Sequence, residues 1–255
     1  MIRIKRPDEI EKMRAAGRLA ARTLTDLARS IVPGKTTTGD LDNLAAELLA
    51  QAGAKASFKG YRGYPNTICA SVNEEVVHGI PGPRALLPGD VCGIDLGVYL
   101  DGYHGDAALT VPVGEVSEEA RRLLRVTREA LHKGIEQARS GQRLGDVSAA
   151  IQRHAEQHGY SVVRDLVGHG IGKALHEEPQ VPNFGEPGRG VRLKVGMTLA
   201  IEPMVNAGVA RINTLADHWT IVTRDKSLSA HFEHTVAITD QGPDILTLGE
   251  TGKDN

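Results

Sequence analysis

The sequence predicts an α+β fold of two similar halves, each a pair of helices followed by strands of a mostly antiparallel sheet. Two observations lead to this prediction. After each pair of helical segments, the hydrophobic pattern changes from a helical period to the alternating period of a half-buried strand. The strands also follow one another in runs, as in α+β folds, and do not alternate singly with helices as in parallel α/β folds.

The first half begins with two predicted helices. Residues 8–31 carry apolar side chains at helical spacing, with Asp8 as the N-cap and a Pro-Gly pair beginning at Pro33 as the end signal. A second helix is expected over residues 38–52, because Gly53 then supplies the usual C-terminal signal. Both helices precede the strands that they are expected to cover.

A hairpin follows these helices. Residues 92–100 and 103–113 are rich in apolar and β-branched side chains, and Asp101-Gly102 lies between them. An Asp-Gly pair favours a two-residue turn, because both positions can adopt positive φ. The sequence therefore predicts two adjacent antiparallel strands.

The second half repeats this order. Ser117 caps a predicted helix that runs to about residue 140, and a fourth helix is expected from residue 145 to Gly159. The strands expected in this half are 197–205, 219–223 and 231–239. The last residues, 251–255, are expected to form a frayed tail.

Helix signals in the two halves are offset by 106 residues. The paired positions are Gly39-Asp40 with Gly145-Asp146, and Gly53 with Gly159. Glycines and capping residues are common at helix ends, so coincidence is one explanation. The other is an internal repeat with halves of about 8–113 and 117–240 inside one domain spanning residues 1–255.

Composition excludes several classes of protein. The chain has 30 Lys+Arg and 32 Asp+Glu, a net charge of −2, and no basic run suited to nucleic acid. Its two cysteines have no CxxC spacing, which excludes a disulfide framework. The sequence has no signal-peptide core and no apolar run of about 18 residues. We therefore expect a soluble cytoplasmic protein without a membrane partner.

Two aspartates in the predicted hairpin indicate a metal site. With a turn at Asp101-Gly102, Asp95 lies opposite Ala108 and Asp106 lies opposite Gly97. The two aspartates are then diagonal neighbours on one face, with Cα atoms about 7–8 Å apart. Their carboxylates repel unless a cation lies between them. Exposure to solvent is the alternative, but aspartate is rare in strands and the flanking residues are apolar.

Two further acids and two histidines are candidates for the same metal site. Glu202 and Glu233 lie in apolar, strand-like runs, where an unpaired carboxylate is costly. One such acid alone would indicate an ion pair, whereas four favour a metal. The glycine-rich segment 167–179 fits neither a dinucleotide fingerprint nor a zinc-protease motif. Its His169 and His176 suggest one ligand and one acid/base or oxyanion-binding group.

The other histidines have less specific surroundings. His132, His154 and His158 fall on predicted helices and are interpreted as ordinary polar or packing residues. His104 and His231 are close in sequence to the metal-site acids and could hydrogen-bond the ligands. No role in the reaction is predicted for these five.

Six segments occur in an order and spacing typical of one enzyme family. They are Ser71-Val-Asn-Glu-Glu-Val-Val-His78-Gly-Ile-Pro, Asp95 with Asp101-Gly-Tyr-His-Gly-Asp106, Gly168-His169-Gly-Ile-Gly, His176-Glu-Glu-Pro-Gln-Val, Ile201-Glu202-Pro-Met-Val-Asn-Ala-Gly, and Ser229-Ala-His-Phe-Glu233-His-Thr. Together they resemble the methionine aminopeptidases over nearly the whole chain. Only 33 residues separate His169 from Glu202, so the chain resembles the short bacterial type I form.

The resemblance implies a pita-bread fold, in which two pseudo-symmetric halves form a curved antiparallel sheet backed by two helix pairs. It implies a single catalytic metallopeptidase domain over residues 1–255. It also implies two divalent ions bound by Asp95, Asp106, His169, Glu202 and Glu233. Asp106 and Glu233 would bridge the ions, Asp95 would complete one site, and His169 with Glu202 would complete the other.

Four carboxylates and one imidazole suit Mn²⁺, Fe²⁺ or Co²⁺, with Zn²⁺ as a further option. The implied reaction is hydrolysis of an N-terminal methionine followed by a small residue, by a hydroxide that bridges the two ions. Glu202 would act as general base and acid. His176 would hydrogen-bond the developing oxyanion, and His78 would contact the scissile amide. A monovalent cation is also implied near Asn73, Glu75 and Ser229.

The resemblance implies a pocket for the methionine side chain, since thioethers pack well on aromatic rings. Its walls would be Phe58, Tyr61, Tyr64, Cys69 and Trp219. For Phe58 and Tyr61, a small packing cluster is an equal alternative. The sequence departs from relatives at Leu175, where many have an aromatic residue, and at Phe58, where some have cysteine.

Two other functions stay open. One is a prolidase-like or proline-specific aminopeptidase of the same fold, and the other is a non-catalytic protein that binds peptides or the ribosome. The expected partners are peptides with N-terminal methionine, including nascent chains at the ribosome during protein maturation. We expect a monomer.

Overall fold

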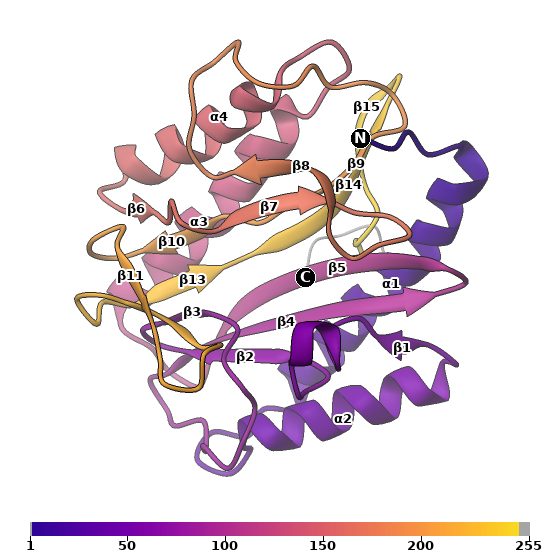
Figure 1. The fold of residues 1–255 in the computed structure, drawn as a ribbon. Coiled ribbons are helices and arrows are strands. Elements are labelled where there is room, and N and C mark those ends of the chain that lie inside the picture. The colour runs from indigo at the N-terminus through magenta and orange to yellow at the C-terminus, as the bar shows by residue number, and fades with distance from the viewer. Residues whose placement is uncertain (1, 250–255) are drawn as a thin grey trace.

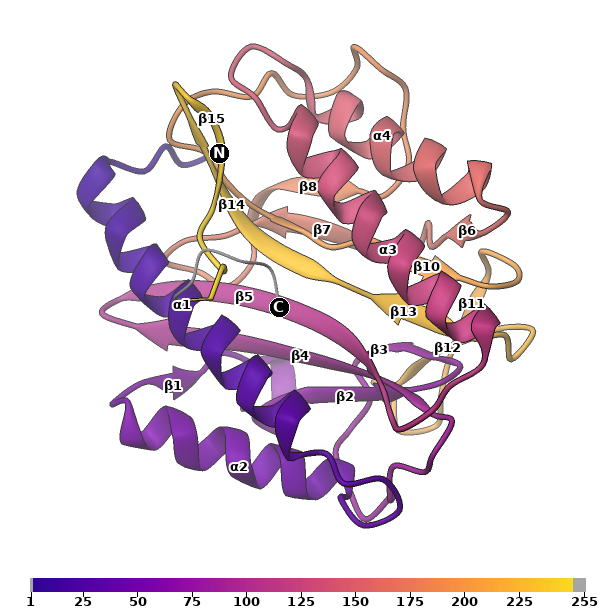
Figure 2. The same cartoon turned by 180° about the vertical axis from the view of Figure 1, so that it is seen from behind.

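A curved antiparallel sheet with helices across its back forms the framework of the molecule (Figures 1 and 2). The structure is a computed structural model that describes residues 2–249. The predicted tail at 251–255 lies outside the described residues. The α+β class and the antiparallel sheet predicted from the sequence are confirmed.

Four α-helices occur in the described part of the chain, at the places that the sequence indicates. They are α1 (Pro7–Ser30), α2 (Thr38–Gln51), α3 (Glu118–Gln137) and α4 (Leu144–Gln157), and a short 3₁₀ helix covers Tyr61–Gly63. Helix α1 begins one residue before the prediction, with Arg6 in place of Asp8 as the N-cap. The proline at its first position explains the shift, because proline has no N–H to satisfy there.

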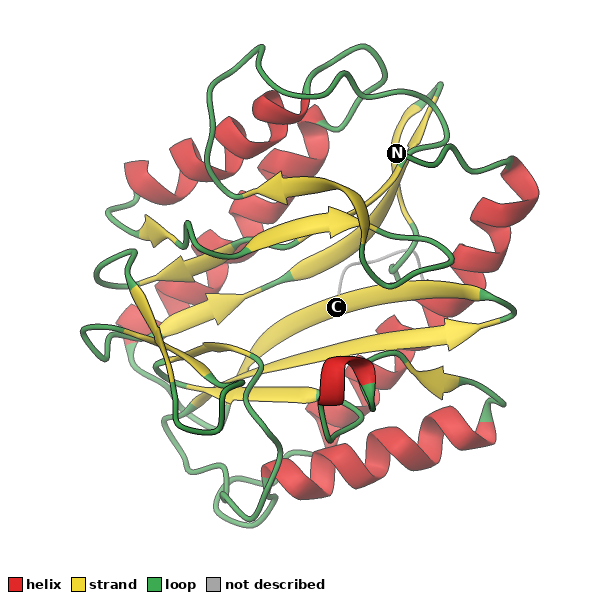
Figure 3. Cartoon of the chain, viewed as in Figure 1, coloured by secondary structure: helices red, strands yellow, loops and turns green. Residues whose placement is uncertain are grey.

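The strands are β1 (Lys55–Ala56), β2 (Cys69–Val72), β3 (Glu75–Val77), β4 (Val91–Leu100), β5 (Tyr103–Pro112), β6 (Ser161–Val162), β7 (Val167–Gly170), β8 (Glu177–Pro182), β9 (Thr198–Ile201), β10 (Met204–Asn206), β11 (Ile212–Thr214), β12 (Ile221–Thr223), β13 (Ser229–His231), β14 (Glu233–Thr239) and β15 (Gly242–Ile245). Nine form the main sheet, in the order β1-β4-β5-β14-β9-β7-β8, with β2 also paired to β4 and β15 to β14. The sets β13-β10-β6 and β11-β12-β3 form two smaller sheets. Figure 3 shows the long strands between the helix pairs.

The predicted hairpin is confirmed in its register. Leu100 pairs with Tyr103 across the turn, and the ladder continues to Val91 opposite Pro112. Asp101 has φ 49° and Gly102 has φ 86°, the positive values that this two-residue turn requires. The hairpin joins β4 and β5 in the middle of the main sheet.

Two strands predicted as continuous are each divided. The run 197–205 is divided between β9 and β10 at Glu202-Pro203, and the run 231–239 between β13 and β14 at Phe232. Proline lacks the N–H that a central strand donates, which explains the first division. The main sheet therefore ends beside Glu202 and Glu233, and the chain crosses into a smaller sheet there.

The core lies between the sheet and the helices. Leu24 and Leu27 of α1, Leu123 and Leu131 of α3, and Ile94 of β4 are at most 2% exposed. Figure 2 shows α1 and α3 crossing the back of the sheet, with α2 and α4 outside them. Within the described residues, no helix has the length and apolar character needed to span a membrane.

Candidate functional site

Paired strands place several predicted site residues in one row across the sheet. Cys69 of β2 pairs with Asp95 of β4, Asp95 pairs with Ala108 of β5, and Ala108 pairs with Glu233 of β14. Directly paired residues point to the same face of a sheet. Asp106 pairs with Gly97, two residues from Asp95, and therefore shares that face.

The next strands bring a histidine to the same face. His169 of β7 pairs with Ala200 of β9, and Ala200 pairs with Thr235 of β14. Thr235 lies two residues after Glu233 and points the same way. Its hydroxyl donates to the Asp106 carbonyl oxygen at 2.8 Å and accepts from the Asp106 N–H at 3.0 Å, which ties β5 to β14 beside the acids.

The resulting distances fit a metal centre. Donor atoms of Asp106, His169 and Glu233 all lie within 4.8 Å of one another. His169 Nε2 lies 3.9 Å from Asp106 Oδ2 and 3.7 Å from Glu202 Oε1. The His169 Nδ1–H donates to the Gly170 carbonyl oxygen at 2.8 Å, which leaves the Nε2 lone pair facing the acids.

Hydrogen bonding provides a test of whether these residues suit a cation. Within residues 2–249, five buried side-chain atoms have no hydrogen-bond partner. Four of them belong to this cluster: Asp95 Oδ1, Asp106 Oδ1, His231 Nε2 and Glu233 Oε1. Buried polar atoms are almost always hydrogen-bonded, so carboxylate oxygens without partners fit a centre that binds cations. The donor set is rich in oxygen, as the sequence predicts.

Electrostatics supports the same conclusion. Burial, reinforced by the neighbouring carboxylates, raises the pKa of Asp95, Asp106 and Glu233 well above the ordinary range. Burial alone raises the pKa of Glu202 to about 8. Divalent cations would remove this penalty by neutralising the acids.

A cavity of roughly 160 Å³ opens in front of the carboxylates. It is lined by every residue that the sequence assigns to the divalent ions or to the substrate: Phe58, Tyr61, Tyr64, Cys69, His78, Asp95, Asp106, His169, His176, Glu202, Trp219 and Glu233. Leu175 and Arg62 complete its walls. The structure thus brings these residues together, and the individual roles stay predictions.

Aromatic rings form much of the rest of the cavity wall. The rings of Tyr64 and Trp219 meet edge to face with centroids 5.1 Å apart, and Trp219 also faces His78 at 6.3 Å. The Tyr64 hydroxyl lies 3.0 Å from the carbonyl oxygens of both Ile68 and Gly79 and can donate its one hydrogen to either. The Cys69 thiol also lines the cavity, and burial, followed by the charge of Asp95, raises its pKa well above the ordinary range.

The two histidines of the cavity differ in position. His176 is exposed, stacks on Tyr61 at 5.1 Å and lies 4.1 Å from the His169 ring. His78 follows β3 with φ 61°, and burial lowers its pKa to about 4. A neutral imidazole at His78 can donate one hydrogen bond and accept another.

Two contacts add residues to the predicted site. His231 Nε2 lies 3.5 Å from Glu202 Oε2, so the sequence proximity of His231 to the acids corresponds to a contact with one of them. Arg62, at φ 49° in the 3₁₀ segment, lies at the cavity and over the Tyr61 ring. No sequence signal identified Arg62, because a single exposed arginine fits no motif.

The residues predicted near a monovalent cation have protein partners. The Asn73 side chain donates to Asp90 and accepts from the Val91 N–H. Glu75 accepts from Arg84 and from the Val72 N–H. The Ser229 hydroxyl donates to Asn206 Oδ1 at 2.9 Å, with the Val205 carbonyl oxygen further away at 3.3 Å. These side chains offer no open donor set, and the monovalent-cation site stays a prediction.

Comparisons with known proteins agree with the site. Residues 11–240 match the model of metallopeptidase family M24. The methionine aminopeptidase of Clostridium acetobutylicum is 54% identical over 251 residues, which cover 98% of this chain and 100% of the relative. Methionine aminopeptidase 1 of Bacillus subtilis is 54% identical, with 97% and 99% covered.

Solved structures show the same relation. The methionine aminopeptidase of Thermotoga maritima superposes with a TM-score of 0.95 at 51% identity, covering 97% of this chain and 99% of that one. The prolidase of Pyrococcus furiosus has a TM-score of 0.76 at 24% identity, covers 97% of this chain and 66% of its own, and shares the fold alone. The chain therefore belongs to metallopeptidase family M24 and, within it, to the methionine aminopeptidases.

Proposed function

We propose that this enzyme removes the N-terminal methionine from peptides whose second residue is small, including nascent chains. The observation that carries the proposal is one cavity that is lined both by a carboxylate-rich centre and by several aromatic side chains. An aminopeptidase needs both, since one binds the reacting end of the peptide and the other its first side chain. Its membership of the family supports the same activity.

The residues that would hold the metals are Asp95, Asp106, His169, Glu202 and Glu233. When bound, two divalent ions would supply Lewis acidity and a nucleophile near neutral pH. Mn²⁺, Fe²⁺ and Co²⁺ suit this donor set, with Zn²⁺ as a further option. The two ions and their identity are part of the proposal.

The protein's own groups would complete the reaction. Glu202 would take a proton from the attacking water and pass it to the amide nitrogen that leaves as an amine. His176 would donate a hydrogen bond to the carbonyl oxygen as that atom gains negative charge. His78 would contact the scissile amide. Rupture of the C–N bond releases methionine and a peptide with a new α-amino group.

The methionine side chain would lie in the cavity wall formed by Phe58, Tyr61, Tyr64, Cys69 and Trp219. Thioether–aromatic contacts favour methionine over aliphatic side chains of similar size. The buried, neutral Cys69 thiol leaves this part of the cavity uncharged. The proposal also includes the expectations that the enzyme is monomeric and acts in the cytoplasm, near the ribosome.

Peptide turnover tests the proposal. With Mn²⁺ or Co²⁺ added, Met-Ala-Ser should be cleaved after methionine, and a Met-Leu-Ser peptide should be cleaved far more slowly. Preference for an Xaa-Pro peptide would favour the prolidase-like alternative. Peptide binding without turnover under any divalent metal would favour the non-catalytic alternative.

A further inference from the structure

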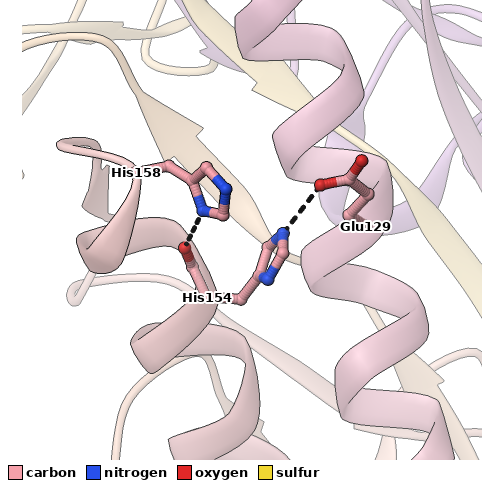
Figure 4. A group of neighbouring side chains, drawn as sticks. All are labelled: Glu129, His154 and His158. Atoms are coloured by element: carbon pink, nitrogen blue, oxygen red, sulfur yellow. Dashed lines mark hydrogen bonds and ion pairs between the residues drawn. The ribbon is translucent and has the colours of Figure 1, made fainter.

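A second group of ligand-type side chains lies on the helices, on the back of the sheet. Glu129 extends from α3, His154 from α4 and His158 from the C-cap position just after α4 (Figure 4). None of the three lines the cavity described above. The sequence interpretation treated both histidines as ordinary helix residues, because it could not show that Glu129 lies beside them.

The three side chains converge closely enough to share one ion. Their donor atoms all lie within 4.8 Å of one another. His154 Nε2 lies 2.9 Å from Glu129 Oε2, and the two imidazole rings are 4.5 Å apart. His158 follows His154 by four residues at the end of α4, and their ring contact places the two imidazoles side by side. The third ligand comes from the neighbouring helix.

Hydrogen bonding fixes the tautomer of one imidazole. His158 Nδ1 lies 2.8 Å from the His154 carbonyl oxygen, which can only accept. Nδ1 therefore carries the proton, and the lone pair is on Nε2. Metal-binding histidines commonly have this arrangement, in which a backbone carbonyl orients the ring.

We propose that Glu129, His154 and His158 form a binding site for a single divalent ion of the zinc class: Zn²⁺, Cu²⁺ or Ni²⁺. Two imidazoles and one carboxylate suit these ions, whereas the carboxylate-rich centre in the cavity suits Mn²⁺, Fe²⁺ or Co²⁺. Three protein ligands leave a fourth position for water. The ion would join α3 to α4.

Two nearby arginines limit the affinity. Arg125 lies 3.3 Å from Glu129 Oε1, and Arg122 donates to the His158 carbonyl oxygen. Their positive charges oppose a cation, but Glu129 Oε2 faces His154 and not Arg125. Without metal, His154 Nε2 and Glu129 Oε2 contact each other, so a bound ion would replace this contact with bonds from both side chains to the ion.

Zinc binding by the full-length, Mn²⁺-loaded enzyme tests the proposal. Equilibrium dialysis with elemental analysis should find one more zinc equivalent on the wild type than on His154→Gln or His158→Gln. Glu129→Gln should raise the dissociation constant for this additional zinc ion by more than about tenfold. Even residues that merely orient a metal ligand change metal affinity by about 10–100-fold. Cu²⁺ bound at the site should show electron paramagnetic resonance couplings from two nitrogens in the wild type and one in His158→Gln.

A matched control variant distinguishes loss of a metal ligand from loss of a negative charge elsewhere on α3. Glu136 lies on α3 two turns after Glu129, is somewhat more exposed (54% against 40%), and also contacts a basic residue, Lys133. Glu136→Gln should bind zinc as the wild type does. Equal zinc binding by the wild type, Glu129→Gln and His158→Gln would overturn the proposal, and so would an equal loss in Glu136→Gln. Glu129→Gln is conservative and partly exposed, so it keeps the test decisive if a histidine variant fails to fold.

Discussion

Asp106 is one of the acids of the proposed metal centre. Its carboxylate lies near His169, it belongs to the close group with Glu233, and one of its oxygens has no hydrogen-bond partner among the described residues. Asp106→Asn keeps the shape of the side chain but removes its charge. The kcat/KM for Met-Ala-Ser should fall more than about 100-fold, because loss of a ligand exceeds the 10–100-fold effect of residues that support ligands.

Asp101→Asn is the matched control for this variant. Asp101 lies in the turn of the same hairpin, is exposed, and has a positive φ that asparagine tolerates. The control should keep wild-type kcat/KM and metal content. Wild-type activity in Asp106→Asn would contradict the proposed centre.

His176 lies at the exposed mouth of the cavity, beside His169 and stacked on Tyr61. If it donates a hydrogen bond to the oxyanion, its effect appears mainly in the transition state. His176→Ala should therefore lower kcat about 100- to 1,000-fold and change KM little. Metal content should stay that of the wild type. The exposed His218, which lies outside the cavity, gives the control variant His218→Ala, and equal kcat in both variants would remove the proposed role of His176.

At the scale of elements, sequence-based reasoning succeeded where the signal was local. Capping residues and helical periodicity identified the four helices, and the Asp-Gly turn alone determined the register that makes Asp95 and Asp106 neighbours. The order β5-β14-β9-β7, which brings Glu233 and His169 beside them, depends on long-range pairing that no local pattern encodes. The motif resemblance grouped these residues without predicting that order.

Short strands could not be predicted for a related reason. Strands such as β1 and β6 have two residues each, too few to show a period. The division at Glu202-Pro203 also went unpredicted, although the proline was visible in the sequence. The residues on both sides of this proline are apolar, and their pattern alone predicts one continuous strand.

The loop that carries His176 is held by the N-terminal arm. Lys5 Nζ lies 2.8 Å from Glu177 Oε2, and the two side chains are only 5% and 8% exposed. The other Glu177 oxygen accepts from the Ala174 N–H, and Lys5 N–H donates to the Gly196 carbonyl oxygen. This ion pair therefore fixes the residue next to His176 against two other segments.

Lys5→Met should lower the free energy of unfolding by about 3–5 kcal/mol, because it leaves a buried carboxylate without its partner. Urea unfolding measures this change. The double variant Lys5→Met/Glu177→Gln should recover part of the loss. Arg6→Met, which removes the exposed pair with Asp8, should cost less than about 1 kcal/mol. An equal decrease in the free energy of unfolding in Lys5→Met and in Arg6→Met would show that the buried ion pair stabilises the fold no more than the exposed one does.

Over the whole molecule, we propose that the two halves are internal repeats. Helices α2 and α4 have equal length and are offset by 106 residues. Asp40 and Asp146 occupy the same helical position, and each accepts the N-cap N–H at 2.8 Å. The backbone bonds from Thr38 to Arg84 and from Leu144 to Val191 also correspond. Equivalent hydrogen bonds in the two halves are harder to attribute to coincidence than glycines at equivalent positions.

The proposed metal centre lies where the two halves meet. Asp95 and Asp106 come from the first half, whereas His169, Glu202 and Glu233 come from the second. Four acids gather across this junction, Asp106 and Glu233 buried and Asp95 and Glu202 half-buried, and they repel one another when they are ionised and no cation is bound. Bound divalent ions would therefore stabilise the junction as well as supply chemistry.

Removal of metal should lower the thermal midpoint. At a free Mn²⁺ concentration about 100 times the dissociation constant, binding stabilises the native state by about 2.7 kcal/mol. For a domain of this size, that corresponds to a rise of roughly 5–10 °C over the chelator-treated protein. Differential scanning calorimetry measures the shift, and Asp106→Asn should lose most of it whereas Glu129→Gln, on the helices, should retain it. An identical thermal midpoint with chelator and with Mn²⁺ would contradict the proposal that bound metal stabilises the junction. The cluster of acids would then be equally stable with and without divalent ions.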